Sequence, residues 1–219
     1  MDYIDVDAKA DLPLPPPGFR YLDFVGGERE LRCFLVPRAM PRAQFMTTYP
    51  DVLDEALDPI YDHEGICVRQ DASYALPAFY IVSLNHQYPA MDSVDEITHL
   101  RMAVVLRELR AGMRTALGID YVHVHYEEKP DDSCNVHYWM MPVLDRKTGA
   151  TTVITRLNIK TYLSGFRFRD MRAEIYANNA TMRSHLAAAG LATRDDALAG
   201  RLSDGSWHAS GVGKAAARP

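Results

Sequence analysis

The spacing of apolar residues in the first part of the chain predicts short strands. Leu31–Val36 and Gly65–Arg69 are brief runs in which apolar residues are closely spaced. Phe79–Leu84 (FYIVSL) is almost wholly apolar and rich in residues that favour strands, which is typical of a strand at the centre of a sheet. The pattern therefore predicts three strands before residue 90.

A long helix is predicted to follow these strands. Ser93 and Glu96 have the spacing of a capping box, in which each side chain bonds a backbone N–H at the start of a helix. Apolar residues then recur every three or four positions until Gly118 ends the run. These residues are Met102, Val105, Leu106, Leu109, Met113 and Leu117.

The second half of the chain predicts more strands and a further helix. Tyr121–Tyr126 alternates in polarity, as Val136–Val143 does in part, and the EEKPDDSCN segment between them has the residues of a reversing loop. We expect an antiparallel pair that the long helix covers on one face. Residues 151–159 are another predicted strand, and a last helix runs over about 169–189 until Gly190. This order predicts an α+β fold.

The two ends of the chain differ in pattern from the middle. Residues 1–18 include the segment DLPLPPP, where proline removes backbone donors, and they are predicted to form a flexible N-terminal arm. Residues 203–219 are small and rich in glycine, which predicts a flexible tail. We find no internal repeat between these ends. Residues 19–202 are therefore predicted to form a single domain that includes a C-terminal helical extension.

Composition and charge argue against several classes of function. The 219 residues carry 24 basic and 29 acidic side chains, a net charge of -5, which argues against a broad nucleic-acid or anionic-membrane surface. The longest uncharged stretch, residues 72–91, contains prolines and several polar groups, so no membrane span is expected. The N-terminus has no apolar signal region, and the three cysteines are scattered. A cytoplasmic protein with reduced thiols is the resulting expectation.

Three of the eight histidines, His123, His125 and His137, lie on the predicted antiparallel pair. His123 and His125 are two residues apart on one strand, so their side chains share a face of the sheet. His137 lies on the partner strand beyond the loop. These side chains are either half-buried polar residues on the solvent side of the sheet or the centre of a functional site.

The segment Asn135–Pro142 (NVHYWMMP) resembles the motif His-φ-His-φ-His-φ-φ of the histidine triad (HIT) superfamily, where φ is apolar and Pro often follows. His137 corresponds to the central histidine, whereas Asn135 and Trp139 replace the other two. The resemblance covers about residues 31–142 and includes the order of elements, with His86 in FYIVSLNHQYP at the end of a strand. In its altered third position the segment resembles the transferase branch of the superfamily, which includes galactose-1-phosphate uridylyltransferase and has Gln in place of the third histidine.

The resemblance implies a HIT-like antiparallel sheet packed by a long central helix, and a homodimer. It also implies a nucleotidyl hydrolase or transferase that acts on a small-molecule nucleotide or phosphate ester and needs no cofactor. His137 would attack an α-phosphorus and form a phosphoramidate, which divides one difficult displacement into two easier ones. The main-chain carbonyl near Asn135 would hold the other ring nitrogen. The altered motif also fits a role in a specialised biosynthetic pathway.

Further residues are candidates for binding the substrate. The resemblance places phosphate donors in the loop before the motif, where Lys129 and Ser133 have suitable groups. Arg167 and Arg169 could form a clamp for an oxyanion. His86 and Trp139 complete the predicted binding set, although an indole offers one donor and no acceptor. The carboxylates of the loop suit an amine-bearing substrate or a divalent metal.

Two alternatives remain open on the residues alone. In the first, His123, His125 and His137, with Glu128 nearby, bind a divalent metal for a different chemistry. In the second, the motif has lost catalysis, and the protein is a nucleotide-binding module in which Tyr138 and Trp139 stack on a base or sugar.

Overall fold

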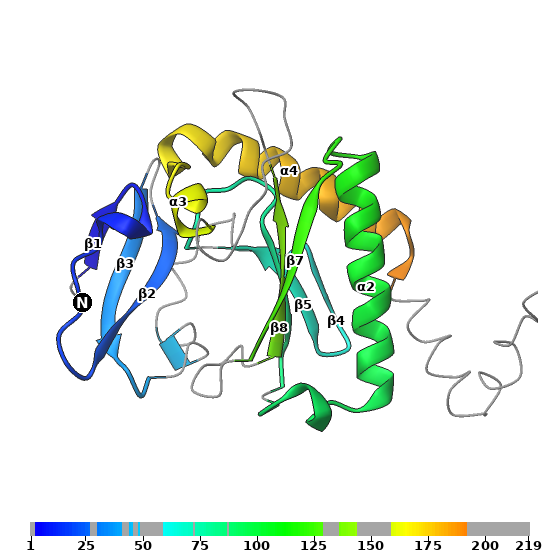
Figure 1. Ribbon diagram of the computed structural model, residues 1–219, viewed down its shortest axis with the longest axis horizontal. Coiled ribbons are helices and arrows are strands. Elements are labelled where there is room, and N and C mark those ends of the chain that lie inside the picture. The colour runs from blue at the N-terminus through cyan, green and yellow to red at the C-terminus, as the bar shows by residue number, and fades with distance from the viewer. Residues whose placement is uncertain are drawn as a thin grey trace, which may run out of the picture.

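The computed structural model describes residues 3–26, 30–40, 44–45, 48, 59–71, 73–86, 88–128, 136–143 and 159–191. These residues form two antiparallel sheets and the helices that pack on them, which confirms the predicted α+β class. The five-stranded sheet lies between the helix α2 and the three-stranded sheet, and α4 runs from one side of the molecule to the other (Figure 1). Within the described residues, no helix has the length and hydropathy needed to cross a bilayer.

The larger sheet has the strand order β4-β5-β6-β8-β7. Its strands are β4 (Tyr61–His63), β5 (Ile66–Gln70), β6 (Tyr80–Leu84), β7 (Val122–Glu128) and β8 (Val136–Pro142). The strand predictions for residues 65–69 and 79–84 are confirmed, and so is the antiparallel pairing of the two strands that carry the histidines. The short strand β4, at the edge of the sheet, was not predicted.

Helix α2 (Glu96–Thr115) covers one face of this sheet, as predicted. Its buried residues Met102, Val105 and Leu109 belong to the same hydrophobic cluster as Val82 and Met140 of the sheet. The spacing of apolar residues in the sequence therefore identified the buried face of the helix correctly, since that face is the one that leaves water.

The predicted capping box at the start of α2 is wrong. Ser93 ends a short 3₁₀ helix, η4 (Met91–Ser93), where its hydroxyl donates to the carbonyl of Ala90 at 2.6 Å. The N-cap of α2 is Asp95, whose Oδ1 accepts the backbone N–H of Thr98 at 2.9 Å. The backbone N–H of Thr98, and its hydroxyl, which donates to Oδ2, lower the pKa of the Asp95 carboxyl. A carboxylate two residues closer to the helix competes successfully with the serine for this position.

The last helix is confirmed as α4 (Phe168–Ala188), which ends before Gly190 at a φ of +61°. A short helix, α3 (Ile159–Leu163), precedes it. Of the strand predicted over residues 151–159, only Ile159 is described, and it begins α3. Along α4, Met182 and Leu186 pack into the cluster under α2, whereas Ile175 packs against the smaller sheet. Helix α4 thus connects the two sheets.

The smaller sheet has the order β1-β3-β2, with β1 (Tyr3–Val6), β2 (Phe19–Gly26) and β3 (Glu30–Pro37). Strand β3 confirms the prediction for residues 31–36. The structure differs from the predicted loose arm, because β1 pairs with β3 and is followed by the 3₁₀ helix η1 (Lys9–Asp11). The prolines that suggested a loose arm come only after η1. The predicted tail, residues 203–219, lies outside the described residues.

Candidate functional site

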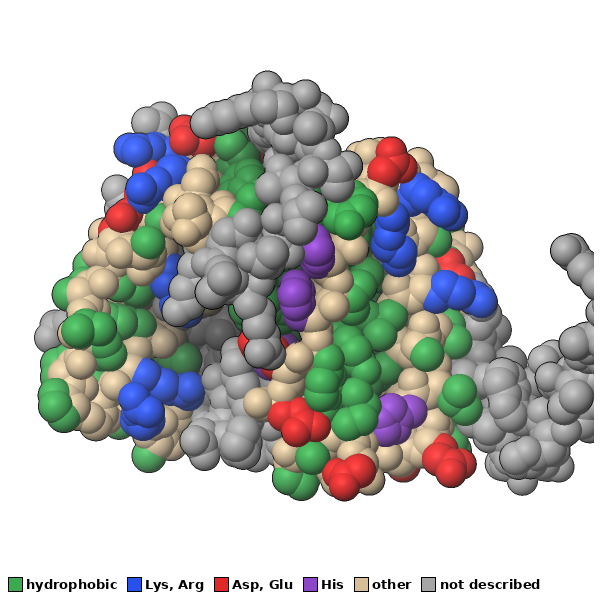
Figure 2. All heavy atoms as spheres, viewed as in Figure 1, with side chains coloured by type: hydrophobic (Ala, Val, Ile, Leu, Met, Phe, Trp, Pro, Cys, Tyr) green, Lys and Arg blue, Asp and Glu red, His purple; other side chains and the backbone are tan. Residues whose placement is uncertain are grey.

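The two faces of β8 have different surroundings. Val136 and Met140 are buried in the cluster under α2, and Tyr138 packs against that cluster. Because side chains alternate along a strand, His137, Trp139 and Met141 point to the other face. That face, which we call the histidine face, looks toward the three-stranded sheet in Figure 1. Neighbouring histidine side chains are visible there in Figure 2.

Strand register brings a row of polar side chains together on the histidine face. His137 of β8 lies opposite Glu127 of β7 on one side and opposite Ser83 of β6 on the other. Directly opposite residues of antiparallel strands point to the same face. His137 and Ser83 are buried, with 2% and 1% exposure, whereas the Glu127 side chain is 35% exposed. The imidazole therefore lies between a hydroxyl and a carboxylate that reaches solvent.

One contact of this row joins Nε2 of His137 to Oε2 of Glu127 at 3.2 Å. When Nε2 carries a proton, the carboxylate accepts its hydrogen bond and orients the ring. Ser83 Oγ has no hydrogen-bond partner among the described residues, so its hydroxyl can donate to another group. The row thus provides a nucleophilic ring nitrogen, a proton acceptor and a hydroxyl donor.

Aromatic rings pack beside the imidazole of His137. The ring centroids of His137 and Trp139 are 6.5 Å apart, and Trp139 meets Phe79 edge-on at 5.4 Å. Tyr74 also contacts Trp139, at 6.5 Å. These contacts hold the indole beside the imidazole. The binding role of Trp139 stays a prediction.

His123 and His125 lie on the histidine face, with their rings stacked at 5.8 Å and an interplanar angle of 17°. Glu128, the acidic residue grouped with them in the metal alternative, points to the other face. It accepts hydrogen bonds from the hydroxyl of Tyr126 and from the backbone N–H of Met91, and both lower the pKa of its carboxyl. Within the described part of the chain, no three His, Cys, Asp or Glu side chains are placed to hold a metal ion.

Arg167 and Arg169 contact the N-terminal segment. Arg167 forms an ion pair with Asp11, and Arg169 forms one with Asp7 at 2.7 Å. These pairs hold η1 against the start of α4, a structural role that the sequence analysis did not predict. No described contact joins either arginine to His137.

Of the remaining predicted site residues, His86 lies within the described part of the chain and three others do not. His86 is exposed in the segment after β6, where its ring meets Tyr88 at 6.4 Å. Asn135, Lys129 and Ser133 lie outside the described residues, so their roles stay predictions.

The sequence analysis missed Glu127 and Ser83. Glu127 had a detectable signal, since it follows His125 by two residues and must share its face. Ser83 had none, because its place beside His137 depends on the pairing of β6 with β8, two strands that are distant in sequence.

Comparison with known proteins gives similarity in structure only. No protein-family model and no curated protein sequence matches the chain. Among solved structures, a Hit-like protein involved in cell-cycle regulation from Bartonella henselae is 12% identical, over 64% of this chain and 93% of that one, with a TM-score of 0.40.

Two further solved structures are similar to this chain at comparable identity, coverage and TM-score. A hypothetical histidine triad nucleotide-binding protein from Sulfolobus tokodaii is 12% identical over 66% of this chain and 91% of that chain, with a TM-score of 0.45. A Zn-bound histidine triad family protein from Mycobacterium smegmatis is 17% identical over 70% and 95%, with a TM-score of 0.42. At these values the likeness concerns the arrangement of elements and carries no residue role to this chain.

Proposed function

We propose that the protein is a HIT-like nucleotidyl hydrolase or transferase that acts on a nucleotide or phosphate ester through a covalent intermediate on His137. The observation that carries this proposal is the contact between Nε2 of the buried His137 and the carboxylate of Glu127. The resemblance of residues 135–142 to the HIT motif supports it, because the central histidine of that motif is His137. Transfer to an acceptor would suit a specialised biosynthetic pathway.

The contact between His137 and Glu127 suggests how protons move in the first step. Starting from the imidazolium–carboxylate pair, the Nε2 proton passes to Glu127 and leaves a lone pair on Nε2. Nε2 attacks the phosphorus, forming the N–P bond as the bond to the leaving group breaks. Glu127 then gives its proton to the leaving group. Because Glu127 is partly exposed, it can turn aside while the phosphorus approaches Nε2.

The second step reverses the first. The Glu127 carboxylate accepts a proton from water or from an acceptor hydroxyl, whose oxygen attacks the phosphorus and breaks the N–P bond. The proton returns to Nε2 and restores the pair. The hydroxyl of Ser83, adjacent to His137 in register, can donate to a phosphate oxygen in both steps. Lys129 and Ser133 remain proposed donors from the loop, with the Asn135 carbonyl as the group that holds Nδ1.

Intact-protein mass spectrometry tests this mechanism. We would incubate the protein briefly with nucleoside phosphoramidates, dinucleoside polyphosphates and nucleotide sugars, and search for an acid-labile nucleotidyl adduct. The wild type should form the adduct, and His137→Ala should not, with turnover at least about 10³-fold lower. His99→Ala, which removes a histidine from α2, is the matched control and should retain the adduct.

Other outcomes would identify a different function. If wild type binds nucleotide without forming an adduct, and His137→Ala binds it equally well, the protein is a nucleotide-binding module. An adduct that persists in His137→Ala would exclude His137 as the nucleophile.

The second candidate is a metal-dependent enzyme, which one observation favours: His123, His125 and His137 lie on the same face of β7 and β8. Their described positions do not form a metal-binding group, so metal binding would require these rings to move. Imidazole nitrogens are common ligands of Zn and of other transition metals. Metal analysis of the purified protein separates the two candidates. One equivalent of Zn, Fe or Mn that is lost in both His123→Ala and His125→Ala would favour the metal site, whereas no bound metal in the wild type would exclude it.

We also propose a homodimer formed through β7, which is an edge strand of the larger sheet. Val124 and Tyr126 are 53% and 38% exposed on this strand, and Figure 2 shows hydrophobic side chains gathered on the surface beside the histidines. An exposed apolar edge strand is suited to pairing with a second copy. Sedimentation velocity should show a dimer that Val124→Lys converts to a monomer; a wild-type monomer would contradict the proposal.

A further inference from the structure

A methionine and a histidine meet on the side of the larger sheet that α2 covers. Nε2 of His99, near the start of α2, lies 2.6 Å from Sδ of Met91 in η4. Both side chains are half-buried, so solvent reaches the pair. Neither residue belongs to the motif around His137, and the proposed function uses neither of them.

The contact is weak as a hydrogen bond. A thioether sulfur is a weak acceptor, and among the described residues no other hydrogen bond engages the ring of His99. The same two groups are good ligands of a soft metal ion, because thioether sulfur selects Cu(I) and imidazole nitrogen also suits copper. The chemistry of the pair therefore indicates a metal ion more strongly than a structural hydrogen bond.

Backbone hydrogen bonds hold both ligand-bearing residues in place. The N–H of Met91 donates to Oε1 of Glu128 at 2.9 Å, and the N–H of His99 donates to the carbonyl of Asp95 at 3.0 Å. Metal bonds of about 2.0 Å to nitrogen and about 2.3 Å to sulfur place these two atoms about 3.5 Å apart at a tetrahedral angle. The unbranched methionine side chain can open the contact by this amount through rotation about its own bonds.

Negative charge surrounds the pair. Four acidic residues belong to the segments that meet here: Asp92, Asp95, Glu96 and Glu128. Residues 85–100 contain no Lys or Arg, and Arg101, the next residue, is paired with Glu64 at 3.3 Å. Figure 2 shows acidic side chains on the surface at this end of α2. The carboxylates also offset the positive end of the helix dipole, so the local charge favours a cation.

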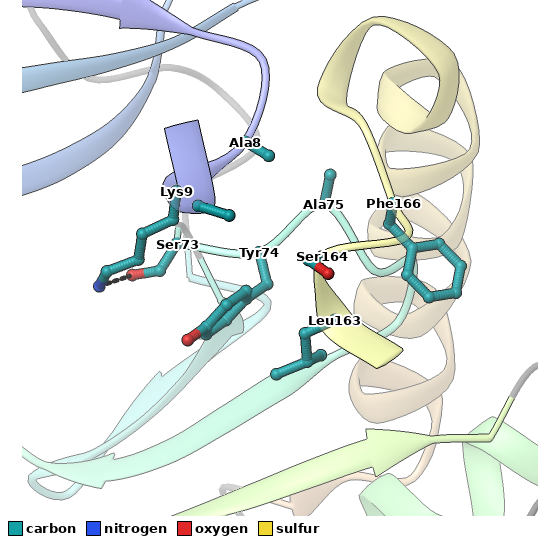
Figure 3. Close-up of a pocket in the computed structure, with 9 residues that line it drawn as sticks. Ala8, Lys9, Ser73, Tyr74, Ala75, Leu163, Ser164 and Phe166 are labelled. Atoms are coloured by element: carbon teal, nitrogen blue, oxygen red, sulfur yellow. Dashed lines mark hydrogen bonds between the residues drawn. The ribbon is translucent and has the colours of Figure 1, made fainter. Parts of the chain in front are cut away.

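A cavity elsewhere in the molecule offers no such ligands. It has a volume of about 230 Å³ and lies between η1, residues 73–75 that follow β5, and the end of α3 (Figure 3). Its described lining residues include no histidine, methionine or cysteine. A soft cation is therefore expected at Met91 and His99 and not in this cavity.

We propose that Met91 and His99 bind Cu(I) through Sδ and Nε2. Binding requires the neutral imidazole with its proton on Nδ1, and water or a solute completes the coordination. Ca²⁺ and Mg²⁺ need several oxygen ligands, and Zn²⁺ is held by three or four nitrogen, thiolate or carboxylate groups, so neither class suits this pair. The site goes beyond the proposed function, because no step at His137 depends on it.

Methionine-methyl NMR of the full chain tests the proposal, with Ag(I) as a probe that shares the ligand preference of Cu(I) and undergoes no redox change. Titration of the Cys134→Ser variant avoids competition from a thiol outside the described residues, and Cys33 and Cys67 are buried. The signal of Met91, identified by its loss in Met91→Leu, should shift most among the methionine signals. A Met91 signal that does not move, or that moves no more than the others, would overturn the proposal.

Met91→Leu and His99→Gln each remove one ligand. Each should weaken Cu(I) binding at least tenfold in anaerobic competition with a chromogenic Cu(I) chelator, and thermal unfolding verifies that each variant folds. Met171→Leu on α4 and His63→Gln on β4 are the matched controls, because both side chains are also half-buried, and they should bind like wild type. Unchanged affinity in either ligand variant, or equal weakening in the controls, would refute the site.

Further titrations separate this site from other readings of the molecule. Zn²⁺ that binds more tightly than Cu(I) and is weakened in His99→Gln would refute the soft class of ion. Cu(I) affinity should be unchanged in His123→Ala, and its loss there would place the ion on the histidine face and overturn the proposal. It should also be unchanged in His137→Ala, so the result is independent of whether a nucleotidyl adduct forms on His137.

Discussion

The two faces of β8 have different surroundings, one apolar and one partly polar, although residues of the two faces alternate along the strand. Toward α2, Val136 and Met140 are buried among apolar side chains of the sheet and the helix. On the histidine face, His137 is also buried, but it contacts the carboxylate of Glu127 and lies opposite Ser83 of the neighbouring strand. Burial alone therefore does not distinguish a packing residue from the proposed nucleophile on this strand. The side chains that surround each residue make this distinction.

Met140→Ala should have the largest effect on stability. Met140 is 1% exposed within the cluster under α2, and truncation of such a side chain costs about 2–5 kcal/mol in free energy of unfolding. Denaturant unfolding measures this loss. Leu14→Ala, outside both sheets with 94% exposure, is the matched control and should change stability by less than about 0.5 kcal/mol. Equal losses in both variants would contradict the assignment of the apolar face.

Glu127→Gln should lower turnover of the best substrate by about 10- to 100-fold, because general acid–base groups contribute at least this much. Glu128→Gln is an exact positional control, one residue along β7 on the opposite face, where Glu128 bonds Met91 and Tyr126. It should retain wild-type turnover. Steady-state rates across pH for both variants make the comparison, since a purely structural role for Glu127 would leave the pH profile unchanged. Equal rates in the two variants would exclude Glu127 from proton transfer.

Asp95→Ala should have the smallest of these effects. It should lower stability through α2, the helix that packs on the apolar face of the larger sheet. Asp95 caps α2, and loss of such a cap costs about 1 kcal/mol. Its pKa is lowered in the folded state by the N–H of Thr98, so its stabilisation is present above the unfolded pKa, near 3.9, and is lost as pH falls through the folded pKa.

Unfolding of the wild type and of Asp95→Ala at pH 7 and near pH 3 measures this dependence. The difference between them should be smaller at the lower pH. Asp120→Ala, in the exposed segment after α2, is the control and should cost less than about 0.5 kcal/mol. A difference that grows on acidification would contradict the cap assignment.

The sequence by itself determined the elements whose signal is local. The periodicity of α2, the alternation around His125 and His137, and the stop at Gly190 all reflect contacts within one element or between adjacent strands. Hydrophobic period and turn chemistry depend on neighbouring residues, so they can be read without the tertiary structure. The cap of α2 was predicted wrongly as Ser93, because Ser93 can also accept a backbone N–H and lies only two residues from Asp95, which the structure uses as the cap.

The tertiary structure decided the contacts between segments that are distant in sequence. It placed Ser83 beside His137 by pairing β6 with β8, and it joined Arg167 to Asp11. Such contacts require the closure of long loops, and their identity depends on which strands pair and in which register. No local pattern around any one of these residues encodes its distant partner.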